Sequence, residues 1–178
     1  MADVELAQLA RDIDARCRLR GEFVLRSGQV AGEYFDKYLF EADPQLLVRV
    51  AGRMAALLPP GTQVLGGLEL GGVPLATALS LQTGLPVLFV RKQAKTYGTR
   101  KLAEGPSPAG QRVTLVEDVI TTGGAVVAAT EALRDLDAIV TMVVCAIDRS
   151  APGESTLAAA GIAVRPVLTK AHLDAAAA

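Results

Sequence analysis

The sequence is short of the side chains on which many catalytic sites depend. It contains one histidine, His172, in an alanine-rich tail, and two cysteines, Cys17 and Cys145. We therefore expect neither a histidine-based catalytic triad nor a histidine-based zinc site. The two thiols lack metal-ligand spacing and are most simply buried small hydrophobic residues.

Two common nucleotide-binding motifs are also missing from the sequence. No G-x-G-x-x-G occurs in the chain, and no lysine follows a G-x-x-x-x-G. This argues against both a dinucleotide fingerprint and a Walker A loop. A net charge of −1 argues against a broad nucleic-acid surface, because such surfaces need clustered lysine and arginine.

Long apolar runs are absent, so we expect no membrane-spanning segment. Residues 1–19 alternate charges with alanine and leucine, where a signal peptide would have an uninterrupted apolar stretch. These features predict a cytoplasmic protein. With 178 residues, 51% of them hydrophobic and 21% charged, the chain suits one globular domain over residues 1–178. We divide it into N-terminal helices and a hairpin (1–60) and a core (61–170).

One stretch, from Val113 to Ala125, has the clearest functional pattern. Val113–Val116 is apolar or β-branched and predicts a short buried strand, which Glu117 and Asp118 follow directly. A turn of small residues then leads into a helix predicted over residues 126–136. The order is therefore strand, turn and helix start.

This order predicts a site for a phosphorylated sugar. Free backbone N–H groups and the positive end of a helix dipole favour an anion, and glycines in the turn let it approach the backbone. The two preceding carboxylates would repel a phosphate unless they face the hydroxyl groups of the ligand or a bridging metal ion. The simpler interpretation is a buried strand with a solvated polar end.

The rest of the chain predicts an α/β fold with a mostly parallel sheet flanked by helices. Strands are expected at 63–67, 87–90, 113–116, 139–147 and 163–168, and helices at 71–81, 126–136 and 153–160. N-terminal to these we expect helices at 3–19 and 43–58 and, between them, an aromatic-rich β-hairpin of residues 21–28 and 34–40. Ligands of such sheets gather at the carboxyl ends of the strands.

A long polar connection follows the strand at 87–90. It begins at Arg91, reaches Gln111, and contains five of the 18 lysine and arginine residues. A solvated charge cluster is the usual explanation of such a run. Beside a predicted phosphate site, however, a cationic lid that closes over a diphosphate becomes the better interpretation.

These patterns together resemble the orotate branch of the type I phosphoribosyltransferase family over nearly the whole chain. The stretch from Glu117 to Ala125 resembles the phosphoribosyl-diphosphate motif of the whole family. The pieces that resemble the orotate branch are Phe23-x-Leu25-x-Ser27-Gly28 with Tyr34-Phe35, the helix start at 72–76, Arg91-Lys92-x-x-Lys95-x-x-Gly98, and Asp148-Arg149.

The resemblance implies transfer of a 5-phosphoribosyl group from phosphoribosyl diphosphate to orotate, as in UMP synthesis. It implies three catalytic residues: Lys95, Glu117 and Asp118. It implies Mg²⁺ as cofactor, held through diphosphate and water near the two carboxylates and not by direct protein ligands. It also implies a homodimer whose loop 92–111 reaches the neighbouring subunit.

The implied binding residues fall into four groups. The carboxylates hold the ribose hydroxyls, the turn binds the 5-phosphate, and cations engage the diphosphate while aromatic residues, Thr121 and Arg149 border the orotate. The full set is Arg26, Tyr34, Phe35, Arg91, Lys92, Lys95, Tyr97, Glu117, Asp118, Val119, Ile120, Thr121, Thr122, Gly123, Gly124, Ala125 and Arg149.

Three departures from the family pattern leave the identity of the acceptor nucleobase open. Leu70-Gly71 stands where a Tyr-Lys pair is frequent, Tyr97 where a loop histidine is usual, and Arg26 where the hairpin usually has lysine. Uracil or a purine remains an alternative acceptor, as does a non-catalytic sensor of phosphoribosyl diphosphate. Arg149, taken alone, could equally form a surface salt bridge with Asp148.

Overall fold

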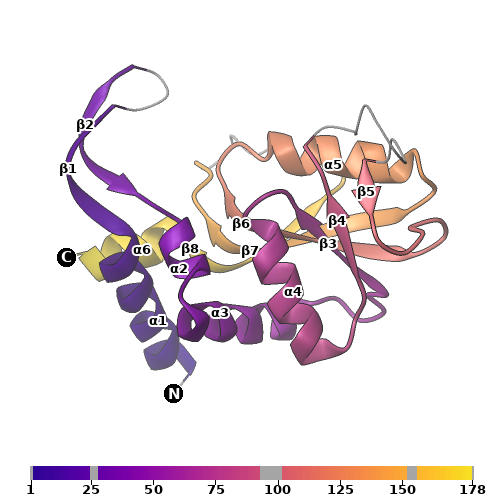
Figure 1. The fold of residues 1–178 in the computed structure, drawn as a ribbon, viewed down its shortest axis with the longest axis horizontal. Helices are drawn as coiled ribbons and strands as arrows, with labels where there is room; N and C mark the ends of the chain where they lie inside the picture. The colour runs from indigo at the N-terminus through magenta and orange to yellow at the C-terminus, as the bar shows by residue number, and fades with distance from the viewer. Residues whose placement is uncertain (1, 25–27, 93–101, 152–155, 178) are drawn as a thin grey trace.

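A six-stranded sheet forms the centre of the protein and collects the carboxyl ends of five parallel strands at one edge (Figure 1). The computed structural model describes residues 2–24, 28–92, 102–151 and 156–177. The strand order is β5-β4-β3-β6-β7-β8, and only β5 runs antiparallel to its neighbour. The strands are β3 (Val64–Leu68), β4 (Val87–Val90), β5 (Ala103–Glu104), β6 (Arg112–Ile120), β7 (Ile139–Asp148) and β8 (Ala163–Thr169).

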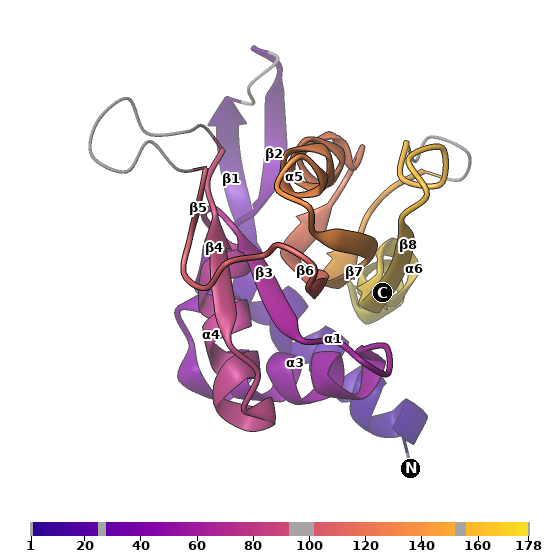
Figure 2. The same ribbon diagram turned by 90° about the vertical axis from the view of Figure 1, so that its right-hand side faces the viewer.

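Helices cover both faces of this sheet, as Figure 2 shows. One core packs α3 (Pro44–Leu57) and α4 (Gly72–Thr83) against one face, with α1 (Ala2–Cys17) behind α3. The other core packs α5 (Gly124–Arg134) against the opposite face. The central strands β6 and β7 are buried almost continuously, as is typical of a parallel sheet between two helical layers.

The N-terminal part forms the predicted hairpin. Strands β1 (Arg18–Val24) and β2 (Val30–Phe35) pair antiparallel and project from the body of the protein. A short helix, α2 (Tyr38–Glu41), follows and leads to α3. Asp43 caps α3 by accepting hydrogen bonds from the N–H groups of Gln45 and Leu46, at 3.0 and 3.2 Å. The final helix, α6 (Lys170–Ala177), contacts α1.

The structure confirms the predicted fold class and corrects four element assignments. Residues 38–40 form helix α2 and not the end of a strand, and the tail forms helix α6. Strand β6 continues to Ile120, so the two carboxylates lie inside the strand and not after it. Of the helix predicted at 153–160, residues 156–160 are described, and they form turns.

Both cysteines are buried free thiols, as predicted. Burial raises the pKa of Cys17 to about 12, and it also raises the pKa of Cys145. Within the described part of the chain, no helix is long and apolar enough to cross a bilayer.

Candidate active site

The turn between β6 and α5 exposes backbone donors at the carboxyl edge of the sheet. Gly123 adopts a left-handed conformation (φ 81°), and a Cβ there would lie 2.7 Å from the side chain of Leu157. No side chain caps α5, so the amides of its first turn remain available to a ligand. Together with the helix dipole they make a suitable site for a phosphate group.

Glu117 and Asp118 lie at the same edge and are both buried. The N–H of Asp118 donates to Glu117 Oε1 at 3.0 Å, and the N–H of Val119 donates to Asp118 Oδ1 at 2.5 Å. Burial, and next the hydrogen bond with Asp118, raise the pKa of Glu117 to about 9. Burial also opposes ionisation of Asp118, but Glu117 and Lys37 outweigh it and lower the pKa of Asp118. Asp118 is therefore the charged member of the pair.

Two further ionisable residues meet Asp118, and the sequence did not point to either. Lys37, between β2 and α2, forms an ion pair with Asp118 through Oδ2 of the carboxylate. Glu41 in α2 is buried, and its Oε1 has no hydrogen-bond partner in the described structure. Burial, and next the neighbouring Asp118, raise the pKa of Glu41 to about 9. The four-residue spacing of Lys37 and Glu41 places them one helical turn apart, a signal that was missed because a strand was predicted there.

The loop after β3 closes against this cluster. A Cβ added to Gly71 would lie 1.6 Å from Asp118 Oδ2, and one added to Gly72 would lie 2.3 Å from the carbonyl oxygen of Val116. Gly71 is one of the departures from the family pattern. The structure explains why a glycine is present at this position. Only glycine leaves room for the observed position of the Asp118 carboxylate.

A second group of predicted residues lines a pocket of about 350 Å³ beside the hairpin. Tyr34 and Phe35 reach it from β2, and the Arg149 guanidinium lies over the Phe35 ring at 5.5 Å. Asp148 accepts hydrogen bonds from the backbone N–H and the hydroxyl of Ser150, at 2.9 and 2.6 Å. Both bonds go to Oδ1 of Asp148, and the Arg149 guanidinium is directed at the aromatic ring.

Not every residue expected around this pocket lines it. Thr121 is exposed and is not among its lining residues. The sequence analysis missed the contribution of α6, which adds Lys170, Leu173 and Asp174 to the lining. Because no helix was predicted there, the side of the pocket that α6 forms was not predicted either.

A third pocket, of about 340 Å³, brings together Arg91, Lys92 and Ala125. The Lys92 N–H donates to Glu69 Oε2 at 3.0 Å, and Arg91 Nε is buried without a hydrogen-bond partner in the described structure. Two predicted diphosphate cations therefore lie beside the start of α5. Three other predicted residues, Arg26, Lys95 and Tyr97, lie outside the described residues.

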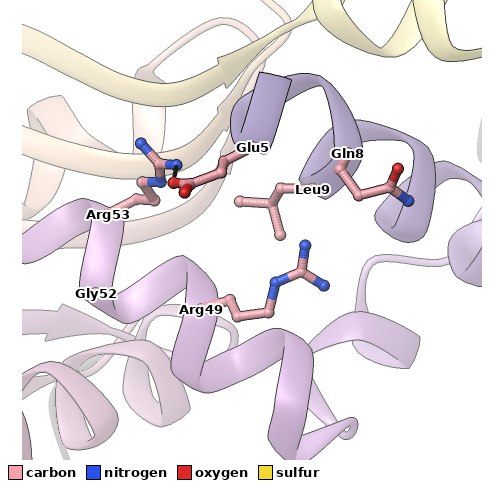
Figure 3. Close-up of a pocket in the computed structure, with 6 residues that line it drawn as sticks. All are labelled: Glu5, Gln8, Leu9, Arg49, Gly52 and Arg53. Atoms are coloured by element: carbon pink, nitrogen blue, oxygen red, sulfur yellow. Dashed lines mark hydrogen bonds and ion pairs between the residues drawn. The ribbon is translucent and has the colours of Figure 1, made fainter. Parts of the chain in front are cut away.

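A groove between α1 and α3 is a different kind of hollow (Figure 3). Its main polar feature is the ion pair of Arg53 with Glu5, at 2.7 Å. It is built from two helices of the N-terminal part and not from the carboxyl ends of the strands. We therefore do not assign the active site to this groove.

The carboxylates at the strand ends could hold Mg²⁺ only if water and substrate phosphates supply its other ligands. Within the described residues, no group of three or more histidine, cysteine, aspartate or glutamate side chains could hold a metal ion. The carboxylate oxygens of Glu117 and Asp118 are hard ligands, which suit magnesium, and Mg²⁺ commonly keeps water and substrate phosphates as its remaining ligands. The residues present therefore fit an ion that arrives with a diphosphate.

Comparisons with known proteins agree with this geometry. Residues 59–159 match the family model described as "Phosphoribosyl transferase domain". The sheet, the hairpin and the site thus define the class as that of the type I phosphoribosyltransferases.

Individual relatives narrow the class. The chain is 71% identical to the orotate phosphoribosyltransferase of Nocardioides sp., over 96% of this chain and 95% of that protein. It is 39% identical to the enzyme of the same name from Methanocella arvoryzae, over 96% and 97%. The chain belongs to the orotate phosphoribosyltransferase family.

A solved structure gives the same result. It is Mycobacterium tuberculosis orotate phosphoribosyltransferase in complex with 5-phospho-α-D-ribosyl 1-diphosphate. It superposes with a TM-score of 0.79 at 30% identity, covering 96% of this chain and 99% of that chain. The fold therefore extends over nearly the full length of both proteins.

Proposed function

We propose that the protein transfers the 5-phosphoribosyl group of phosphoribosyl diphosphate to orotate, giving orotidine 5′-monophosphate and diphosphate. One juxtaposition carries this proposal. At the carboxyl edge of the sheet, the charged Asp118 and the uncapped start of α5 lie on neighbouring parts of one strand–turn–helix unit. A carboxylate for ribose hydroxyls and donors for a phosphate are what a phosphorylated ribose needs.

The reaction breaks the bond between the anomeric carbon and the diphosphate oxygen and forms a bond to a ring nitrogen of orotate. Positive charge develops on the sugar and negative charge on the leaving group. Asp118, with Glu117 beside it at the ribose hydroxyls, would stabilise the positive charge, and Arg91, Lys92 and Lys95 would stabilise the negative charge. No side-chain nucleophile is required.

Mg²⁺ would be held through diphosphate and water near Glu117 and Asp118. When bound, it supplies charge neutralisation of the diphosphate. The chain's own residues orient the two substrates around it. Thr121 to Ala125 would bind the 5-phosphate, with the backbone of the turn as the main donor.

Base recognition is proposed for the pocket beside the hairpin. Arg149 lies over Phe35 and has donors suited to a carboxylate, which orotate has and which uracil and hypoxanthine lack. Tyr34 and Phe35 would contact the ring, with Arg26 at its border, whereas Thr121 does not line this pocket. Tyr97 would lie with Lys95 over the diphosphate.

We expect Arg149→Ala to raise the KM for orotate by about 10- to 100-fold, because a charged hydrogen bond to the substrate is lost. Binding of phosphoribosyl diphosphate should change little. Steady-state kinetics with each substrate varied in turn measures both effects. Arg53→Ala, which removes a half-buried arginine paired with Glu5 away from this pocket, is the matched control. Equal weakening of both substrates would mean that Arg149 does not select the base.

We further propose that the chain works as a cytoplasmic homodimer and as a single domain over residues 1–178. Residues 103–104 of the expected loop 92–111 form β5 in this chain's own sheet, so we propose that the part of the loop before them extends to the neighbouring subunit and places Lys95 at its diphosphate. The polar composition of this loop supports the proposal. The contact of α6 with α1 supports a single domain, because it joins the two ends of the chain.

A further inference from the structure

Lys37 is the one ionisable residue of the cluster around Asp118 that carries a positive charge. Its ammonium group pairs with Asp118 and also acts electrostatically on Glu117 and Glu41. The side chain is 34% exposed, whereas that of Asp118 is 1% exposed. Lys37 thus stands between solvent and a buried carboxylate.

Each oxygen of the Asp118 carboxylate is held by a different element. Oδ1 accepts from the Val119 N–H of its own strand, at 2.5 Å. Oδ2 is held by Lys37, which comes from the turn between β2 and α2. Glu117 and Glu41 also lie against the Asp118 carboxyl group, but neither carries a positive charge. Without Lys37, the buried carboxylate would lose its only cation in the described structure.

Gly71 shapes the third side of the carboxylate. A Cβ at this position would lie 1.6 Å from Oδ2 and 2.3 Å from the carboxyl carbon of Asp118. The backbone of Gly71 is right-handed helical (φ −66°, ψ −29°), a conformation open to any residue. The glycine is therefore required by the carboxylate and not by the backbone.

We propose that Lys37 is a positioning residue that fixes the Asp118 carboxylate for the ribose of phosphoribosyl diphosphate. The inference rests on the proposed function. A buried carboxylate that loses its ion-pair partner turns to another position, and its charge then no longer faces the sugar. Lys37 acts through Asp118 and need not touch the substrate.

The first test is Lys37→Met, which keeps the length of the side chain and removes the charge. We expect kcat/KM for phosphoribosyl diphosphate to fall by about 10- to 100-fold, as for partners that orient a site residue. Calorimetry should show weaker binding of Mg²⁺–phosphoribosyl diphosphate, and Lys37→Arg should recover part of the loss. Arg53→Met is the matched control, because it removes a half-buried cation of α3 that pairs with Glu5 of α1, away from the proposed site. Wild-type kinetics and binding in Lys37→Met would overturn the proposal.

A double-mutant cycle separates positioning from an independent role. If Lys37 acts through Asp118, the variant Lys37→Met/Asp118→Asn should be no slower than Asp118→Asn alone. Multiplied losses would show that Lys37 acts on the substrate directly, and would overturn the proposal. The double variant removes both the buried carboxylate charge and its partner, so it avoids the destabilisation expected from an unpaired carboxylate.

Gly71→Ala tests the same carboxylate with Lys37 in place. The added methyl group should displace Oδ2 and lower kcat/KM for phosphoribosyl diphosphate by about 10-fold or more. Gly32→Ala is its control, since nothing lies within 4 Å of a Cβ there. Full activity of Gly71→Ala would overturn the proposal even if Lys37→Met failed to fold.

Failure of this inference and failure of the proposed function give different results. If the unaltered protein releases no diphosphate with any base, the proposed function fails. If the unaltered protein releases diphosphate and the Lys37 and Gly71 variants have the same kcat/KM for phosphoribosyl diphosphate, only the positioning role of Lys37 fails.

Discussion

We expect Asp118→Asn to lower kcat by about 10²- to 10³-fold, on the order of losing one preorganised electrostatic group. Asparagine keeps the shape of the side chain and removes its charge. Asp118 is the member of the carboxylate pair whose pKa is lowered, with burial opposed by Glu117 and Lys37. We therefore expect it to carry the negative charge that faces the developing positive charge on the ribose. Steady-state turnover at saturating concentrations of both substrates measures the effect.

Asp135→Asn is the matched control for this variant. Asp135 ends α5 and is exposed, so its replacement should leave turnover unchanged. Circular dichroism and thermal melting should show that Asp118→Asn remains folded. A folded Asp118→Asn protein with wild-type turnover would contradict the assignment of Asp118 to the reaction.

The second large effect is a recovery of activity in mixed subunits. If residues 92–111 serve the neighbouring subunit, Lys95→Ala and Asp118→Asn place their lesions in different halves of one site. Each variant alone should be nearly inactive. A hybrid dimer would contain one site with both lesions and one with neither. Unfolding and refolding the two variants together should restore about one quarter of wild-type activity, since half the dimers are hybrid and half their sites are intact.

The control is each variant refolded alone, which should remain at its own low activity. If Lys95 and Asp118 of the same chain form one site, every site in the mixture contains one lesion and mixing restores nothing. A monomeric protein on a sizing column would also contradict the shared site.

The strand–turn–helix unit could be predicted because its residues are consecutive. The apolar run before Glu117 and the glycines after Thr122 are local signals, and they placed the turn correctly. Local signals gave the wrong end for β6, because two carboxylates seemed to close the strand. Pairing of Val119 with Ile147 extends it by tertiary contact.

The cluster of Lys37, Asp118 and Gly71 could not be predicted in the same way. These residues come from three distant parts of the chain and meet only when the hairpin connection packs against the strand ends. Aromatic residues at 38–40 favoured a strand, but the Asp36 side chain accepts from the Tyr38 N–H at 3.1 Å and starts a turn. That turn directs Lys37 towards the site.

Helix α6 was missed although its composition favours helix. Alanine has the highest helix propensity, and Leu173 supplies a buried contact. The tail was treated as low complexity, so the wall it adds to the pocket with Arg149 was overlooked. Arg26, Lys95 and Tyr97 remain predictions from sequence, since they lie outside the described residues.

The most direct test of the account is release of diphosphate from phosphoribosyl diphosphate by the purified protein with Mg²⁺ and one base at a time. We expect release with orotate and a rate with uracil or hypoxanthine lower by about 10³-fold or more, because neither offers a carboxylate to Arg149. Release that is equal for all three bases, or faster with uracil or hypoxanthine, would contradict the assignment of orotate. No release with any base would contradict the proposed function itself.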